Sequence, residues 1–430
     1  MEFSHDCIRH PPTIPGENRT HPFPSIVTNT SPPQPRSLLR LMGKRFNTFK
    51  NHTFPIVWQV MPRKVLRLLP GSSQTFGPPR RSASLADYRR KASVEWRLVS
   101  PAHTETLPAP FYCSDPQLFA KETEVSWPET GVAVFKDARI LDEHAWVVGR
   151  EDTFIGDLCY LGNSAQSRAN HILKLYPPRH VAGRTLNLCS ANAVTNFFHY
   201  VVDSVSRYDL VRRAGFDWSD FDHVILPRFR TATTAEIDEA MGVPEEKVIR
   251  MGRREQLICE TLIQPSFPGP LACTPPWVID FYRELFPRPE AKPHRKIYFP
   301  RRGNRHPANA AEVDAHLLAR GFELLDPVST PDLRMRIAEA THVVAVHGAC
   351  LANLVFSSPG TKVLEIMPTE ISSYYNRAFY RVLCASARLP YGAVIGKSAR
   401  LRLTAYSPQP KTAFHVNLDE LDAGLAALLA

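Results

Sequence analysis

The stretch 346–353 contains the residue types of a ligand-binding turn. His347, Gly348 and Ala349 directly follow the apolar run 342–346, which predicts a buried β-strand, and a helical pattern begins behind them. Gly348 and Ala349 are small, so the backbone can approach a ligand closely there. The unpaired N–H groups and the positive end of the following helix suit a phosphate group. An ordinary strand–helix turn with a buried histidine is the alternative, and this stretch alone does not decide between the two.

Three more charged residues fall on the same predicted edge. Arg301 and Arg302 follow the strand predicted at 296–299, and Glu365 lies late in the strand predicted at 362–367. Two guanidiniums could clamp a pyrophosphate, each charged hydrogen bond contributing roughly 1.5–3 kcal/mol. Burying a carboxylate in an apolar strand is costly unless it is partnered, and ribose hydroxyls would be suitable partners for Glu365. A solvated basic turn and an edge-facing glutamate are the alternatives.

A second candidate site lies earlier in the chain. His199 and Asp203 are four residues apart on a helix predicted at 196–214, and they share a face away from its apolar stripe. One of them could act as the general base that takes a proton from an acceptor hydroxyl, while the other orients it. A surface His–Asp pair without function is the alternative.

The sequence gives no convincing metal or redox centre. Asp220 and Asp222 form an Asp-x-Asp triplet, but they precede the strand predicted at 223–226 instead of following it. The eight cysteines include no Cys-x-x-Cys pair. We therefore expect neither a metal ion nor another cofactor.

Alternating strand and helix patterns must position these residues. Four strand–helix units in succession in the C-terminal third predict a parallel doubly wound sheet, whose ligands bind at the carboxyl ends of the strands. A shorter α/β pattern precedes them, and the proline-rich segment 287–293 separates the two. We predict an α/β domain at 98–290 and a second, ligand-binding α/β domain at 291–430.

The N-terminal residues 1–97 are rich in proline and basic residues, which predicts a disordered or loosely structured tail. Residues 1–100 hold 16 Lys/Arg and five Asp/Glu, so the remaining 36 basic and 37 acidic residues nearly cancel. A near-neutral folded part argues against a nucleic-acid partner, whereas the tail could contact an anionic membrane peripherally. No apolar run reaches the roughly 18 residues of a spanning helix, and no secretion leader is evident. These features favour a cytoplasmic protein, at most peripheral at the inner membrane face.

The candidate residues keep an order and spacing that resemble glycosyltransferase family 61, which includes bacterial capsule and lipopolysaccharide enzymes. The resemblance covers roughly residues 130–400. Its N-terminal motif is matched by Asn196, Phe197, His199, Tyr200 and Asp203, although Tyr200 stands where tryptophan is usual and Ser204-Val205 where Leu-Pro is common. Its C-terminal motif is matched by Arg301-Arg302-Gly303, Asn309, Glu312, Gly321-Phe322-Glu323, His347-Gly348-Ala349, Leu351, Asn353, Phe356, Gly360 and Glu365-Ile366.

The resemblance implies a GT-B-like fold, with two Rossmann-like doubly wound domains facing a cleft. The domain at 98–290 is then the acceptor side, and the domain at 291–430 binds the nucleotide sugar. It also implies inverting, metal-independent transfer from a nucleotide sugar, with a UDP-sugar expected, to a glycan or lipid-linked glycan acceptor in surface polysaccharide or glycoconjugate synthesis. Asp203 is then the first choice as base, with His199 as its partner. The expected donor-binding residues are Arg301, Arg302, His347, Gly348, Ala349, Asn353 and Glu365. A sugar-nucleotide epimerase on the same fold and a non-catalytic sugar-binding or scaffold protein are the alternatives.

Overall fold

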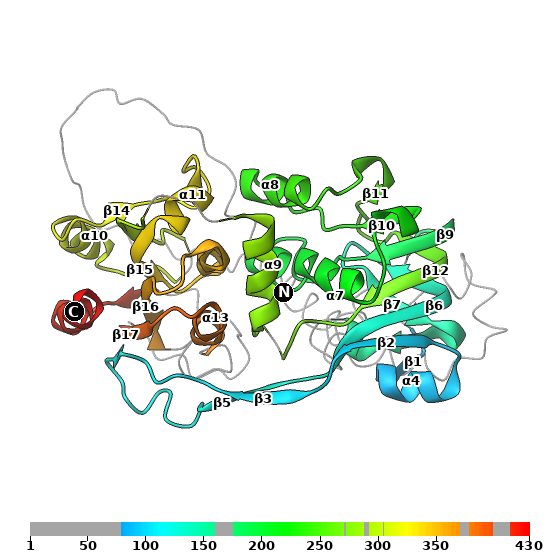
Figure 1. Ribbon diagram of the computed structural model, residues 1–430, viewed down its shortest axis with the longest axis horizontal. Helices are drawn as coiled ribbons and strands as arrows, with labels where there is room; N and C mark the ends of the chain where they lie inside the picture. The colour runs from blue at the N-terminus through cyan, green and yellow to red at the C-terminus, as the bar shows by residue number, and fades with distance from the viewer. Residues whose placement is uncertain are drawn as a thin grey trace, which may run out of the picture.

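Two large β-sheets, each covered by helices, form the frame of the molecule (Figure 1). The computed structural model describes residues 79–159, 175–270, 272–287, 292–303, 305–369, 378–398 and 413–430. The first sheet draws its strands from residues 81–265 and the second mainly from residues 295–398. The molecule is therefore a mixed α/β protein with two halves that follow one another along the chain.

The first sheet joins a parallel part to an antiparallel part. Its strand order is β1-β8-β7-β6-β12-β9-β10-β11, with β2 also paired to β6. β12 runs parallel to β9 and antiparallel to β6, so it is the strand at which the two parts meet. The strands are β1 (Arg81–Ala83), β2 (Glu95–Ser100), β6 (Thr130–Leu141), β7 (Trp146–Gly149), β8 (Thr153–Ile155), β9 (Arg179–Asn187), β10 (His223–Ile225), β11 (Val248–Ile249) and β12 (Gln256–Pro265).

The second sheet confirms the parallel strands predicted for the C-terminal third. Its order is β14-β13-β15-β16-β17-β18, and all neighbours from β14 to β17 are parallel. The strands are β13 (Arg295–Phe299), β14 (Glu323–Leu324), β15 (Ala340–Val346), β16 (Lys362–Pro368), β17 (Tyr391–Ser398) and β18 (Phe414–His415). The connecting helices are α10 (Ala310–Leu318), α11 (Leu333–Ala338), the 3₁₀ helix η7 (Ala349–Phe356), α13 (Phe379–Ala387) and α14 (Leu418–Leu429).

The helix predicted at 196–214 is broken in the structure. It forms α6 (Phe197–Val201), a 3₁₀ turn η4 (Val205–Arg207) and α7 (Tyr208–Arg213). Two serine hydroxyls at the break bond to backbone carbonyls, Ser204 to Leu188 and Ser206 to Val202. Such bonds compete with a regular helical ladder, which explains why apolar periodicity alone overestimated this helix. The other helices of this half are α8 (Ala232–Ala240) and α9 (Pro276–Leu285).

Residues 81–97 correct the predicted extent of the N-terminal tail. They form β1, helix α4 (Leu85–Lys91) and the start of β2, all attached to the first sheet. Ser84 caps the helix by accepting from the Asp87 N–H, and Leu85 and Tyr88 are buried. The basic and small residues of this segment led to the prediction of a loose tail, although Leu85 and Tyr88 anchor it to the first sheet. Residues 1–78 lie outside the described residues, so the tail predicted there stays a prediction.

A strap from the first half reaches across to the second sheet. Strands β3 (His103–Thr106) and β5 (Glu124–Trp127) pair with each other, and between them β4 (Tyr112–Cys113) pairs with β17 (Figure 1). The buried Arg381 of α13 donates to the carbonyls of Pro108 and Glu122, at 2.8–3.2 Å. The strap therefore ties the two halves together.

The two halves also share a hydrophobic core at their junction. One continuous cluster of buried side chains includes Phe198 and Val201 of α6, Leu351 of η7 and Leu383 of α13. Because the apolar face of α6 is buried against the second half, the two halves are packed directly on one another. No helix in the described ranges is both long and apolar enough to cross a membrane.

Candidate active site

His347 and Glu365 form a buried hydrogen-bonded pair at the carboxyl end of the second sheet. His347 follows β15, and Glu365 lies in β16, in register with Ala345. His347 Nδ1 is 2.5 Å from Glu365 Oε1, and the Tyr391 hydroxyl donates to Glu365 Oε2 over 2.6 Å. The Glu365 side chain is fully buried. The structure therefore gives this carboxylate His347 and Tyr391 as partners, in place of the ribose hydroxyls expected from the sequence.

The surroundings of His347 keep its imidazole neutral. Burial lowers the pKa of His347 below its usual value, Glu365 opposes this effect, and the nearby Arg305 and Arg301 lower the pKa further. A neutral imidazole carries one ring proton, and we place it on Nδ1, where it is donated to the Glu365 carboxylate. Nε2 is then an acceptor, suited to a hydroxyl group.

Arg301 is held against the turn that follows β15. Its Nη1 donates to the His347 carbonyl over 2.9 Å. A β-carbon at Gly348 would overlap Nη1, so the absence of a side chain at this position leaves room for the guanidinium. Gly348 was predicted to let a ligand approach the backbone. In the structure, the space beside it is filled by the Arg301 guanidinium.

Arg302 does not join Arg301. It is exposed and forms an ion pair with Asp314 of α10. Consecutive side chains after a strand point in different directions, so the two arginines have different partners here, and a clamp by both of them stays a prediction.

Arg305 is a cation of the site that the sequence reasoning missed. Its side chain is half-buried, and its Nε is buried with no hydrogen-bond partner among the described residues. Burial and the charge of Arg301 lower its pKa to about 10, and it also interacts electrostatically with Tyr380 and Glu365. Its backbone is left-handed (φ 62°), which is uncommon for a residue with a side chain. The spacing of Arg301 and Arg305 in one short loop was the signal available in the sequence.

The helix predicted after Gly348 is present and is a 3₁₀ helix, Ala349–Phe356. Ala349 is half-buried at its first position. Asn353 is 2% exposed and donates from Nδ2 to the Cys350 carbonyl over 2.9 Å. Asn353 Oδ1 is buried without a partner in the described part of the chain. The structure thus places Asn353 beneath the turn, where it supports η7 from within.

His199 and Asp203 form the second histidine–carboxylate pair. The Asn196 side chain caps α6 by accepting from the Phe198 N–H over 2.9 Å. One turn later His199 Nδ1 lies 2.5 Å from Asp203 Oδ2, which confirms that the two side chains share a face. Their side chains are 14% and 4% exposed, so this is not the surface pair that was the alternative.

Aromatic side chains link the two pairs across the junction of the halves. The Tyr380 ring meets the His347 ring at 5.2 Å and the Phe198 ring at 5.7 Å, both edge-on, and the Phe198 ring meets the His199 ring at 5.4 Å. A chain of ring contacts therefore connects the two pairs, one on each half.

A comparison with known protein families matches residues 197–364 to the family described as Glycosyltransferase 61. The chain carries a glycosyltransferase family 61 domain over these residues. It is therefore a glycosyltransferase, an enzyme whose substrates are a sugar donor and a glycan acceptor. The matched region begins at α6 and ends one residue before Glu365, so it spans both histidines and both site arginines. No curated protein matches the chain.

The tyrosine at position 200 of this glycosyltransferase has a structural task. Tyr200 is buried, and its hydroxyl donates to Asp238 of α8, which also pairs with Arg230 at 2.9 Å. Tyr200 therefore anchors α6 to α8.

One group of side chains in the described ranges has the spacing of a metal site. Ligand atoms of Asp142, Glu143 and His144 lie within 4.8 Å of one another in the turn between β6 and β7. All three already have partners: Asp142 accepts from the Arg254 N–H, Glu143 pairs with Arg253 at 3.2 Å, and His144 Nδ1 contacts the Ala191 carbonyl at 2.8 Å. The triplet Asp220–Asp222 is likewise engaged, since both carboxylates accept from Arg184.

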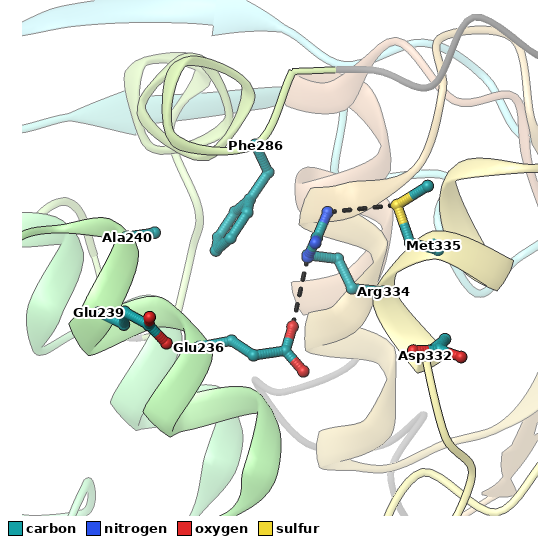
Figure 2. Close-up of a pocket in the computed structure, with 7 residues that line it drawn as sticks. All are labelled: Glu236, Glu239, Ala240, Phe286, Asp332, Arg334 and Met335. Carbon is teal, nitrogen blue, oxygen red and sulfur yellow. Dashed lines mark hydrogen bonds and ion pairs between the residues drawn. The ribbon is translucent and has the colours of Figure 1, made fainter.

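A hollow of about 420 Å³ lies elsewhere, between α8, the end of α9 and α11 (Figure 2). Arg334 extends across it, 4.3 Å from the Phe286 ring centre and 3.4 Å from Glu236. Glu239 and Asp332 also line the hollow. None of the predicted site residues does, so this hollow and the two histidine pairs are separate features.

Proposed function

We propose that this glycosyltransferase moves a sugar from a nucleotide sugar, a UDP-sugar by expectation, to a glycan acceptor with inversion and without a bound metal. The observation that carries the proposal is the half-buried Arg305, whose Nε has no partner within the described residues, beside Arg301. Two guanidiniums in a partly dry site can stabilise the charge that develops on a departing nucleoside diphosphate.

On the donor side, Arg301 and Arg305 would bind the diphosphate, and His347 Nε2 would accept a hydrogen bond from a donor hydroxyl. Glu365 would act through His347 by fixing the orientation and tautomer of its ring, because both of its oxygens are engaged inside the chain. Gly348 leaves room for Arg301, while Ala349 and Asn353 shape η7 below.

On the acceptor side, His199 would be the base and Asp203 its orienting partner. This order reverses the first choice made from the sequence, because the Asp203 side chain is 4% exposed and faces His199. The acceptor oxygen would attack the anomeric carbon and give its proton to His199 Nε2. The bond from that carbon to the diphosphate oxygen would break, and the electron pair would leave with the nucleoside diphosphate.

The proposal includes a GT-B-like arrangement in which the two halves correspond to the two Rossmann-like domains. The parallel second sheet supports this correspondence for the donor half. The strap and the shared core support a site held together at the junction of the halves. A cytoplasmic enzyme acting on a lipid-linked or polysaccharide acceptor, with its basic N-terminal residues near an anionic membrane, completes the proposal.

Titration calorimetry with UDP in a chelator-containing buffer tests the donor site. Arg301→Ala and Arg305→Ala should each weaken binding at least tenfold, a difference of about 1.4 kcal/mol. Unchanged UDP affinity in both variants would refute the assignment.

A turnover assay then separates the alternatives. Consumption of a UDP-sugar without any acceptor, yielding an isomeric UDP-sugar, would identify an epimerase. Activity that is lost in chelator and returns with manganese would overturn the metal-independent mechanism.

A further inference from the structure

Tyr391 holds the oxygen of Glu365 that does not face His347. Its hydroxyl donates to Glu365 Oε2 over 2.6 Å, while Glu365 Oε1 meets His347 Nδ1. Tyr391 is 5% exposed and Glu365 is fully buried, so solvent has little access to this carboxylate. Burial raises the pKa of the Tyr391 hydroxyl well above its usual value, so the hydroxyl remains a donor. A carboxylate whose two oxygens both accept hydrogen bonds inside the protein is held in one orientation.

The strap (residues 103–127), which crosses from the first half, holds Tyr391 in turn. The Phe111 N–H donates to the Tyr391 carbonyl over 2.9 Å, and β4 continues this pairing along β17. The Phe119 ring meets the Tyr391 ring edge-on at 6.0 Å. Phe119 is 5% exposed, so this contact belongs to the packed interior. The strap therefore contacts both the backbone and the ring of Tyr391.

Arg381 of α13 fastens the part of the strap that carries Phe119. Its guanidinium carbon lies 5.1 Å from the centre of the Phe119 ring. The same group donates to the carbonyls of Pro108 and Glu122, which lie on either side of Phe119 along the chain. Because both carbonyls bond to one buried guanidinium, the intervening segment is closed against α13. The Phe119 ring is therefore held beside Tyr391 by contacts of its own.

We propose that Tyr391 is a positioning residue of the donor site and that the strap of the first half keeps it in place. The strap sets the ring of Tyr391, the Tyr391 hydroxyl sets the Glu365 carboxylate, and Glu365 sets the ring of His347. With its Nδ1–H directed at Glu365, His347 presents Nε2 as an acceptor to the donor substrate. This inference rests on the proposed role of His347 in donor binding. One half of the chain thereby helps to orient a donor-binding residue of the other half.

Nitrogen NMR of the full chain, isotope-labelled at histidine, shows which ring nitrogen of His347 carries the proton, with His347→Gln assigning the signals. In the parent protein we expect the proton on Nδ1. Tyr391→Phe removes one oxygen atom and keeps the ring against Phe119, so the freed carboxylate should turn and the proton should be shared between Nδ1 and Nε2. If the Nδ1–H form falls to about one third of the population, UDP affinity in calorimetry should fall about threefold.

Tyr112→Phe is the matched control. Tyr112 lies in β4 of the strap, opposite Gly392 of β17, and its hydroxyl donates to the Glu420 carbonyl over 3.0 Å. The substitution removes the same atom from a neighbouring tyrosine that does not contact Glu365, so the His347 signals and UDP affinity should stay unchanged. Phe119→Leu tests the strap itself, and it should shift the His347 proton in the same direction as Tyr391→Phe, by a smaller amount.

A proton that stays on Nδ1 of His347 in a folded Tyr391→Phe variant would overturn the proposal, as would an equal change in Tyr112→Phe. Unchanged His347 signals in Phe119→Leu would remove the strap from the proposal. If Tyr391→Phe does not fold, Phe119→Leu carries the test by itself. The NMR measurement needs no ligand, so a parent protein that binds no UDP would refute the proposed function and still leave the orientation of His347 to be measured.

Discussion

The molecule contains two histidine–carboxylate pairs with the same short contact and different surroundings. Each has 2.5 Å between histidine Nδ1 and a carboxylate oxygen. The His199–Asp203 pair is local, four residues apart on α6, and its histidine retains some exposure. The His347–Glu365 pair joins two strands, is more deeply buried, and lies beside Arg301 and Arg305.

The different surroundings suit the two histidine–carboxylate pairs to different roles. Cations beside an imidazole oppose its protonation, so His347 is poorly suited to take a proton and well suited to stay neutral beside a bound anion. His199 faces the buried Asp203 carboxylate and keeps 14% of its side chain exposed, an arrangement that suits a base. Neighbouring charges, more than the pair itself, determine the role.

Replacing each carboxylate by its amide should produce the largest divergence between the pairs. Asp203→Asn should lower kcat by roughly 10²–10⁴-fold, because the base loses its orienting partner, while UDP affinity in calorimetry stays unchanged. Glu365→Gln should weaken UDP binding and lower the melting temperature, because a buried carboxylate with two partners is lost. If Glu365→Gln instead abolishes turnover at full UDP affinity, the roles of the two pairs are exchanged.

Gly348→Ala should change the donor site beside the His347–Glu365 pair and leave the His199–Asp203 pair unaffected. The added methyl group would displace the Arg301 guanidinium, and we expect UDP affinity to fall about tenfold, equivalent to about 1.4 kcal/mol. Gly303→Ala is the matched control in the neighbouring loop, where an added β-carbon meets nothing within 4 Å. Equal losses in both variants would show that loop flexibility, not the place of Arg301, is responsible.

Low pH should reduce the stability of the folded protein through His347 of the second pair. Its folded-state pKa is lowered, so below its usual value of about 6.5 the unfolded chain takes up a proton that the folded protein resists. Stability should therefore fall as the pH drops through this range, and by less in His347→Gln than in the parent protein. Melting curves at pH 7.5 and 5.5 measure the difference, with the exposed His180→Gln as control. An identical acid sensitivity in His347→Gln and the parent would refute the buried neutral imidazole.

Arg302→Ala should have the smallest effect. The exposed pair with Asp314 contributes at most about 1 kcal/mol, and the side chain points away from Arg301. UDP affinity should stay within about twofold of the parent, in contrast to Arg301→Ala. A loss as large as that of Arg301→Ala would support the double-arginine clamp expected from the sequence.

The amino-acid sequence by itself determined the features that depend on local spacing. Residues four apart on a helix share a face, so the His199–Asp203 contact followed from their numbers. Strand–helix alternation predicted the parallel second sheet, and the residue order predicted the family. The limits of local spacing appear at Ser204 and Ser206, whose hydroxyls break the predicted helix.

Only the tertiary structure decided what depends on register and side-chain direction. Glu365 meets His347 because β15 and β16 are neighbours with Ala345 opposite Glu365, a pairing that no short-range pattern contains. Arg305 turns toward the site while Arg302 turns to Asp314, although both follow the same strand. The physical reason is common to these cases: a charge takes its role from the groups that surround it after folding, and those groups come from distant parts of the chain.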